Sequence, residues 1–134
     1  MRKVASTLLL LIASAPALAD WSKIITSANS TGYADLHSLQ KNGAISAMQI
    51  LIDFKKPPFD GNNLPYLSLK MEMEYDCAAN KFRALKTTSF ADHMATGSSP
   101  YTSFEPDVWK TPTSASIQKT FWDIACSSES EISN

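Results

Sequence analysis

Residues 66–77 read YLSLKMEMEYDC, and this segment decides the fold. Its odd positions are apolar and end in Cys77, whereas its even positions carry Tyr66, Ser68, Lys70, Glu72, Glu74 and Asp76. Successive side chains of a β-strand point to opposite faces, so this period of two predicts a strand with one buried side and one wet side. Cys77 falls on the buried side. We interpret the alternating acidic residues as a solvated strand face and not as a metal or catalytic site.

Shorter strands are expected around this segment, at 21–27, 33–36, 44–54, 81–89 and 101–104. A C-terminal helix is expected because Ile117, Phe121, Ile124 and Ala125 recur at helical spacing, with Thr113 or Ser114 as its N-cap. The apolar stripe of such a helix needs an apolar surface to cover it. The fold class is therefore α+β: a sheet of about six mostly antiparallel strands, with one C-terminal helix packed on its apolar face.

The first nineteen residues have the pattern of a cleaved signal peptide. Arg2 and Lys3 precede an apolar run, and Ala17-Leu18-Ala19 forms an A-x-A site, so cleavage is expected between Ala19 and Asp20. The run is about half as long as the roughly 20 residues of a membrane span, although an uncleaved anchor is the alternative. Because Asp20 and not cysteine follows the cut, we expect no lipid anchor. No later stretch is long or apolar enough to span a bilayer, so we expect no membrane span and a location in the periplasm or outside the cell.

Length and composition also limit the number of domains and the kinds of partner expected for the rest of the chain. We expect a single domain over residues 20–126 and a polar tail over 127–134. Residues 1–19 hold two of the twelve basic residues and none of the thirteen acidic ones, so residues 20–134 carry ten basic and thirteen acidic residues, a net charge of −3. Nucleic-acid-binding proteins show basic clusters or stripes, so no nucleic acid is expected as a partner.

The chain has two cysteines, Cys77 and Cys126, and both follow the signal peptide. An exported chain meets an oxidising compartment, and two cysteines allow one intramolecular pairing. We therefore expect a Cys77–Cys126 disulfide that tethers the end of the helix to the long strand. Two free thiols or one intermolecular bridge are the alternatives.

No group of residues converges on catalysis. His37 and His93 are the only histidines, and neither has the spacing of a zinc site or a serine elbow beside it. We expect a non-enzymatic protein with no catalytic residue, metal or cofactor. Aromatic residues dominate protein interfaces, and Tyr66, Tyr101 and Trp122 are the candidates for partner contacts. The loops at 55–65 and 91–99 and an exposed strand edge, which could also pair with a second copy, complete the expected binding surface.

The pattern resembles the surface-adhesin protein E family of small exported bacterial proteins. The matching residues run through the chain in order: Trp21, Gly32-Tyr33-Ala34-Asp35, Ile52-Asp53-Phe54, Ser68, Glu74-Tyr75-Asp76-Cys77, Trp109-Lys110-Thr111-Pro112 and Ala125-Cys126. The resemblance implies an antiparallel sheet with a C-terminal helix bonded to it through a disulfide. It also implies binding of host extracellular-matrix or plasma proteins.

Two functions therefore compete at this point. The first is a non-enzymatic binding module outside the cytoplasm, with an adhesin-like role implied by the resemblance. The second is a small exported inhibitor or envelope-stress protein acting on a hydrolase, because a compact disulfide-closed β domain suits inhibition by a protruding loop.

Overall fold

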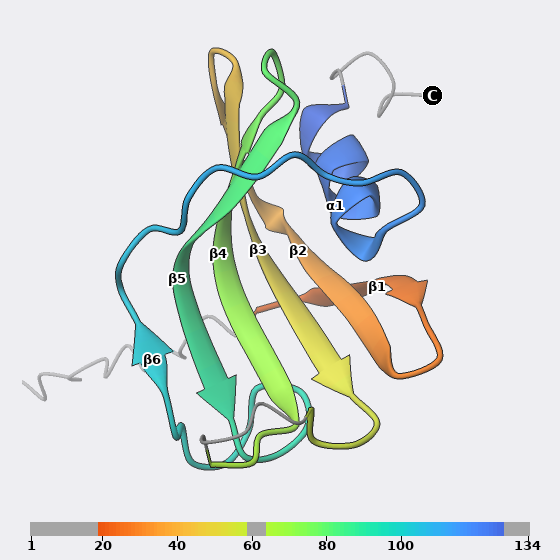
Figure 1. The fold of residues 1–134 in the computed structure, drawn as a ribbon, viewed down its shortest axis with the longest axis vertical. Coiled ribbons are helices and arrows are strands. Elements are labelled where there is room, and N and C mark those ends of the chain that lie inside the picture. The colour runs from red at the N-terminus through yellow and green to blue at the C-terminus, as the bar shows by residue number, and fades with distance from the viewer. Residues whose placement is uncertain (1–18, 59–63, 128–134) are drawn as a thin grey trace, which may run out of the picture.

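The computed structural model describes residues 19–58 and 64–127, and within them the chain forms one six-stranded antiparallel sheet and one helix (Figure 1). The strands lie in the order of the sequence, and each pairs with the strand before it. The elements are β1 (Trp21–Thr26), β2 (Ser30–Asn42), β3 (Ile45–Phe54), β4 (Ser68–Asp76), β5 (Lys81–Phe90), β6 (Thr102–Ser103) and α1 (Ile117–Cys126). The predicted fold class is confirmed.

Parts of the sequence predictions lie outside the described residues. These parts are positions 1–18 of the expected signal peptide, positions 128–134 of the polar tail, and positions 59–63 of the long loop. The described part of the chain contains no helix with the length and apolarity that crossing a membrane requires.

One face of the sheet, here called the covered face, packs against α1. The strand register places Met48 beside Met73, and Ile50 beside both Ala34 and Met71. Paired residues share a face, so these side chains form continuous apolar rows across β2, β3 and β4. The buried core consists of Ala34, Met48, Ile50, Ile52, Met73, Tyr75, Phe121 and Ala125. The strand predicted at 44–54 is confirmed as β3, and the alternation predicted for 66–77 is confirmed in β4, where Met73 and Tyr75 are buried on this face.

Helix α1 begins later than the sequence suggested. The Ser116 side chain accepts a hydrogen bond from the Lys119 amide at 3.1 Å, so Ser116 is the N-cap and the expected Thr113 or Ser114 is wrong. Ala115 has a φ of 59°, and this left-handed residue turns the chain immediately before the cap. The predicted apolar stripe is confirmed, because Phe121 and Ala125 are both fully buried.

A disulfide joins Cys77, just beyond β4, to Cys126, the last residue of α1. The predicted pairing is therefore confirmed. The two Cα atoms lie 5.5 Å apart, and the sequence separation is 49 residues. The Lys41 ammonium also donates a hydrogen bond to the Ser127 carbonyl. Both β4 and the β2–β3 hairpin thus fix the C-terminal end of the helix.

Strand β2 is much longer than the expected strand at 33–36. Its register shifts between Asp35 and Gln40, and side chains satisfy the backbone in between. The Ser38 hydroxyl donates to the Asp35 carbonyl at 2.6 Å and accepts from the Gln49 amide at 2.9 Å, while the Asp35 carboxylate accepts from the His37 amide at 3.1 Å. This bulge interrupts the alternation of side chains, so the sequence pattern ends where the strand continues.

The two edges of the sheet differ. Residues 101–110 run along the outer edge of β5, where the Ser89 amide donates to the Tyr101 carbonyl at 2.9 Å. Phe82 and Lys110 exchange two backbone hydrogen bonds, each of 2.9 Å. Along β1, by contrast, no described residue pairs with the outer edge of the strand. Within the described chain, β1 is therefore the edge left open to another strand.

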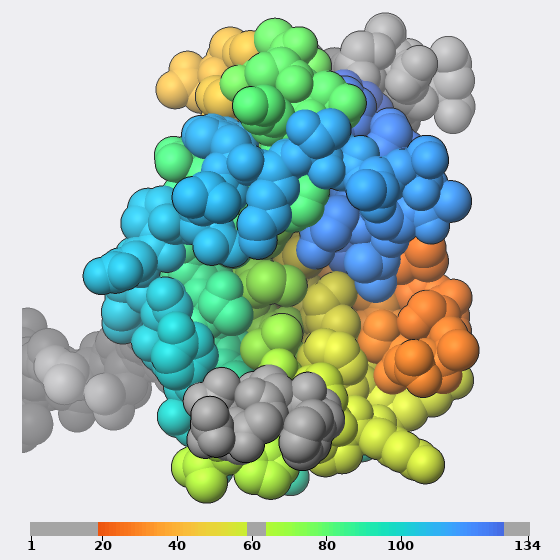
Figure 2. Space-filling view, viewed as in Figure 1, coloured from red at the N-terminus to blue at the C-terminus, as the bar shows by residue number. Residues whose placement is uncertain are grey.

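Residues 104–116, here called the strap, link β6 to α1 across one end of the covered face (Figure 1). The Trp109 ring of the strap stacks on the Arg83 guanidinium of β5, with 4.4 Å between Arg83 Cζ and the ring centre. Arg83 Nε in turn donates a hydrogen bond to Glu74 Oε1 at 2.8 Å. Pro112, further along the strap, is buried. Figure 2 shows α1 and the strap over the upper part of this face, with atoms of β3 and β4 in view below them. The strap is thus stacked on the sheet and not loosely tethered.

One buried polar atom leads to a prediction about stability. The Tyr75 side chain is fully buried, and among the described residues its hydroxyl has no hydrogen-bond partner. Burying an unpaired hydroxyl costs about 1–3 kcal/mol, so we expect Tyr75→Phe to raise the free energy of unfolding by about 1 kcal/mol in chemical denaturation. Tyr101→Phe removes a hydroxyl at an exposed position and serves as the matched control, so its free energy of unfolding should equal that of the wild type.

The same variant has a signature in pH. Burial raises the pKa of the Tyr75 hydroxyl well above its usual range. The unfolded chain therefore loses this proton first, and the wild type should lose stability as the pH rises above about 10. In Tyr75→Phe the free energy of unfolding should fall less between about pH 10 and higher pH than it does in the wild type. If both proteins lose the same stability over this range, Tyr75 is not the group responsible.

Candidate functional site

Three connections meet at one end of the sheet, which we call the loop end: residues 27–29, 54–58 with 64–67, and 90–101. β3 and β5 finish there and β4 begins there, because neighbouring strands run in opposite directions (Figure 1). Backbone hydrogen bonds join the connections, from the Lys55 amide to the Asn29 carbonyl and from the Leu67 amide to the Phe90 carbonyl, each at 2.9 Å. The two loops proposed from the sequence, 55–65 and 91–99, thus share one surface.

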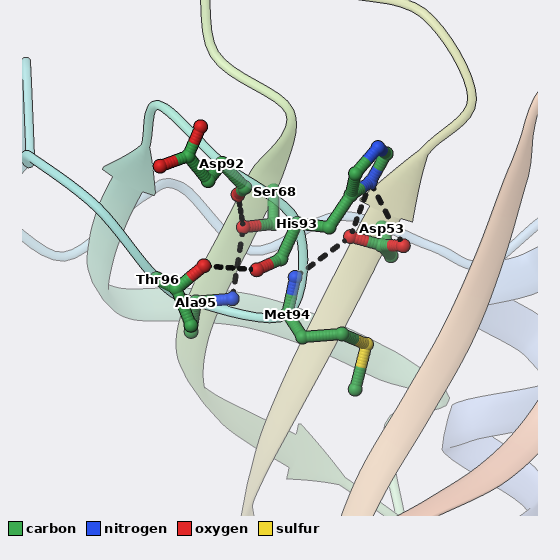
Figure 3. Close-up of polar contacts among 7 residues, drawn as sticks. All are labelled: Asp53, Ser68, Asp92, His93, Met94, Ala95 and Thr96. Carbon is green, nitrogen blue, oxygen red and sulfur yellow. Dashed lines mark hydrogen bonds and ion pairs between the residues drawn. The ribbon is translucent and has the colours of Figure 1, made fainter.

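The loop after β5 is fastened to the sheet face opposite the helix, which we call the open face (Figure 3). The Ser68 hydroxyl, fully buried, donates to the Asp92 carbonyl at 2.7 Å and accepts from the Ala95 amide at 3.0 Å. The Asp53 carboxylate accepts from the Met94 amide at 2.9 Å and lies 3.2 Å from His93 Nδ1. Two side chains on neighbouring strands therefore hold four consecutive loop residues.

These contacts hold the loop in a conformation that its residues do not favour alone. Met94 and Ala95 have φ values of 56° and 58°, in the left-handed region that costs non-glycine residues energy. Further hydrogen bonds close the loop, from the Ala91 amide to the Ser98 carbonyl at 2.8 Å and from the Thr96 hydroxyl to the His93 carbonyl at 2.6 Å. The loop is thus preformed, with His93, Thr96 and Ser98 exposed around its tip.

The anchoring role of Ser68 can be measured. Ser68→Ala leaves the Ala95 amide without its acceptor and the Asp92 carbonyl without its donor, so we expect a loss of about 1–3 kcal/mol in unfolding free energy. Hydrogen exchange at the Met94 and Ala95 amides should become at least about tenfold faster, because the loop opens locally. Ser99→Ala is the control, since Ser99 is exposed and its hydroxyl contacts are 3.5 Å long. Unchanged exchange at these amides would disprove the anchoring role.

The structure brings two of the three candidate aromatic residues to the loop end. Tyr66 is half-buried and meets Phe54 edge-on, with 5.9 Å between ring centres. Tyr101 is 56% exposed, while its carbonyl group is held by Ser89. Trp122 lies on α1 instead, half-buried against the core.

Two exposed apolar residues beyond the loop end were missed in the sequence. Phe104 and Val108 are each 72% exposed, at the start of the strap. Their signal was present in the sequence, since both stand among Glu105, Pro106 and Asp107 in a stretch without apolar periodicity. Like Tyr101, both are exposed apolar residues of the segment 101–110, which runs along the outer edge of β5.

Each of the two histidines pairs with a different carboxylate. His37 Nε2 lies 3.6 Å from an Asp20 oxygen on the exposed surface, whereas His93 pairs with Asp53. Arg83 pairs with Glu74, so part of the acidic row on β4 is neutralised. In residues 19–58 and 64–127 no three His, Cys, Asp or Glu side chains are grouped so that they could hold a metal ion. In the part of the chain that the structure describes, the loop end offers a surface for contact.

The chain matches the model of a known protein family. The family model of surface-adhesin protein E matches residues 21–127, so the chain belongs to the surface-adhesin protein E family. Among curated protein sequences, none matches the chain significantly.

Solved structures of Haemophilus influenzae protein E are similar in fold. Crystal form II of that protein has a TM-score of 0.60 at 12% sequence identity, covering 79% of this chain and 86% of the other. A second structure of H. influenzae protein E has a TM-score of 0.58, again at 12% identity, with 79% and 83% covered. Protein E from a non-typeable strain has a TM-score of 0.56 at 12% identity, with 79% and 74% covered.

The residues that carry the family resemblance have structural roles here. Asp53 and Ser68 anchor the loop, and Trp109 stacks on Arg83. Cys77 and Cys126 form the disulfide. These residues build the scaffold and position the loop end.

Proposed function

We propose that this protein is a non-enzymatic binding module that works outside the cytoplasm and engages a protein partner through its loop end. The observation that carries the proposal is the preformed loop at 91–98, held by Asp53 and Ser68 beside the exposed Tyr101. A loop ordered before binding loses little conformational entropy on contact, so its exposed groups contribute more to affinity. Membership of the surface-adhesin protein E family supports a partner among host extracellular-matrix or plasma proteins.

The proposed location follows from the start of the sequence. Cleavage after Ala19 would release a chain that begins at Asp20, without a cysteine for lipid attachment, into the periplasm or the medium. We expect the intact mass of the exported protein to correspond to residues 20–134. A retained segment 1–19 or a lipid adduct would contradict this.

Partner binding can be tested with residues 20–134 and a panel of immobilised matrix and plasma proteins. Tyr66→Ala, Tyr101→Ala and a shortened 55–65 loop remove anchors from the loop end, and Trp122→Ala removes the third candidate aromatic residue. We expect Tyr101→Ala to weaken binding by at least about tenfold, as for an interface aromatic residue. Circular dichroism first establishes that each variant is folded.

Lys70→Ala and Glu72→Ala, on the open face away from the loop end, are the controls and should bind as the wild type does. If the loop-end variants all keep full affinity, the proposal fails. A loss in Trp122→Ala alone would then move the binding surface to α1, and full affinity there too would leave the open face around Lys70, Glu72 and Glu74 to examine. A dimer built through sheet edges would use β1, because residues 101–110 line the outer edge of β5.

A further inference from the structure

A surface pocket of about 580 Å³ opens beside the β1–β2 turn, where β3 ends. Its lining consists of Ala28, Asn29, Phe54, Lys55, Lys56, Pro57 and Pro58. Figure 1 shows the turn and the chain leaving β3 side by side, and the hydrogen bond from the Lys55 amide to the Asn29 carbonyl joins them. The volume falls within the roughly 300–1,000 Å³ of small-molecule sites.

The walls of this pocket are held in place before any ligand arrives. In the turn, the Ser27 amide donates to the Ser30 carbonyl at 2.8 Å, and the Ser30 amide donates to the Ser27 hydroxyl at 3.2 Å. Phe54 on the opposite side is fixed by the edge-on Tyr66 ring. The consecutive prolines that follow restrict the backbone further.

Among the described residues that line the pocket, the only charged side chains are those of Lys55 and Lys56. Lys55 and Lys56 are exposed, and within the described chain neither ammonium forms an ion pair or a hydrogen bond. No carboxylate is among the lining residues. The rest of the lining is mainly apolar, with the Phe54 ring and three small or cyclic aliphatic side chains. This combination suits a ligand with an acidic head and an apolar body.

We propose that this pocket binds small amphiphilic acids, of which a medium-chain fatty acid is the simplest. The carboxylate would sit between the ammonium groups of Lys55 and Lys56, and the alkyl chain would lie against Phe54, Pro57 and Pro58. The pocket lies within the loop end, so a ligand would share this surface with the protein partner proposed above, but the test below needs no protein partner.

Decanoate is the probe, titrated into residues 20–134 while backbone amide shifts are followed by NMR. We expect saturable one-to-one binding, with the largest shifts at Asn29 and Lys55. The double variant Lys55→Gln/Lys56→Gln loses both charge contacts with the carboxylate, and at this exposed site its affinity for decanoate should fall about tenfold. Lys23→Gln/Lys81→Gln removes the same charge from exposed positions elsewhere and should leave binding unchanged.

A second pair of variants tests the pocket itself. Ala28→Trp places a large ring in the opening without changing charge and should abolish binding, whereas Ala79→Trp, in the exposed β4–β5 turn, should not. Acetate and decanol, which lack the tail and the charge respectively, should each bind at least about tenfold more weakly than decanoate. Shifts centred elsewhere, equal binding of acetate, or full affinity in Ala28→Trp or in the double lysine variant would overturn the proposal.

Discussion

Replacing both cysteines, Cys77→Ala/Cys126→Ala, should lower the free energy of unfolding by about 4 kcal/mol, because the disulfide closes a long loop. For a domain of this size the melting temperature should fall by about 15 °C. The loss has a local cause as well as an entropic one, since the bond fixes the end of α1 to the end of β4. Thermal and chemical denaturation measure both quantities.

The reduced wild-type protein is the control for the double variant, because it loses the bond without losing the cysteine side chains. It should melt close to the variant, and the oxidised wild type should melt well above both. A difference of only a few degrees between the oxidised and reduced forms would show that packing alone holds the helix.

Phe121→Ala should destabilise the protein by about 3–5 kcal/mol, the usual loss for a large aromatic side chain removed from a core. Phe121 is fully buried and lies over Gly32, where an added Cβ would come within 2.9 Å of the end of the ring. Ile117, on the same helix, comes within 3.0 Å of the same point, so two side chains of α1 pack over Gly32. Lys119→Ala, on the solvent side of the same helix, provides the control and should cost less than about 1 kcal/mol.

The close approach at Gly32 provides a second check on the same packing. Gly32→Ala should cost about 1–3 kcal/mol, because the new Cβ would also meet Ile117 at 3.0 Å and Ile25 at 3.1 Å. In a Phe121→Leu background the end of the ring is absent, so the same substitution should cost less. Additive losses in the double variant would contradict direct contact between positions 32 and 121.

The sheet and helix could be predicted because their patterns are local. The alternation over 66–77 needs no information from elsewhere in the chain, and it also sets the direction of Cys77. The stripe from Ile117 to Ala125 is likewise local. β2 was underestimated because Ser38 and Asp35 satisfy the backbone across its bulge, which no periodicity reveals. The N-cap was misplaced because the left-handed turn at Ala115 depends on how the strap meets the sheet.

The candidate site was predictable in composition and not in geometry. Loops at 55–65 and 91–99 are evident from their turn residues, and Tyr101 stands out as an aromatic residue near one of them. The anchors could not be found, because Asp53 and Met94 are 41 residues apart in sequence. Ser68 looked like one more polar residue on a solvated strand face, yet it is fully buried beneath the loop that it holds.

The order of the strands also bears on how the chain acquires its shape during synthesis. Every strand pairs with the one made just before it, so no part of the sheet waits for a partner still to be translated. Helix α1 follows all six strands in the sequence, and Cys126 is its last residue. Oxidation must therefore follow the completion of the sheet, and with two cysteines there is no wrong intramolecular pair to correct. The disulfide therefore stabilises a strand order that the hairpins have already formed.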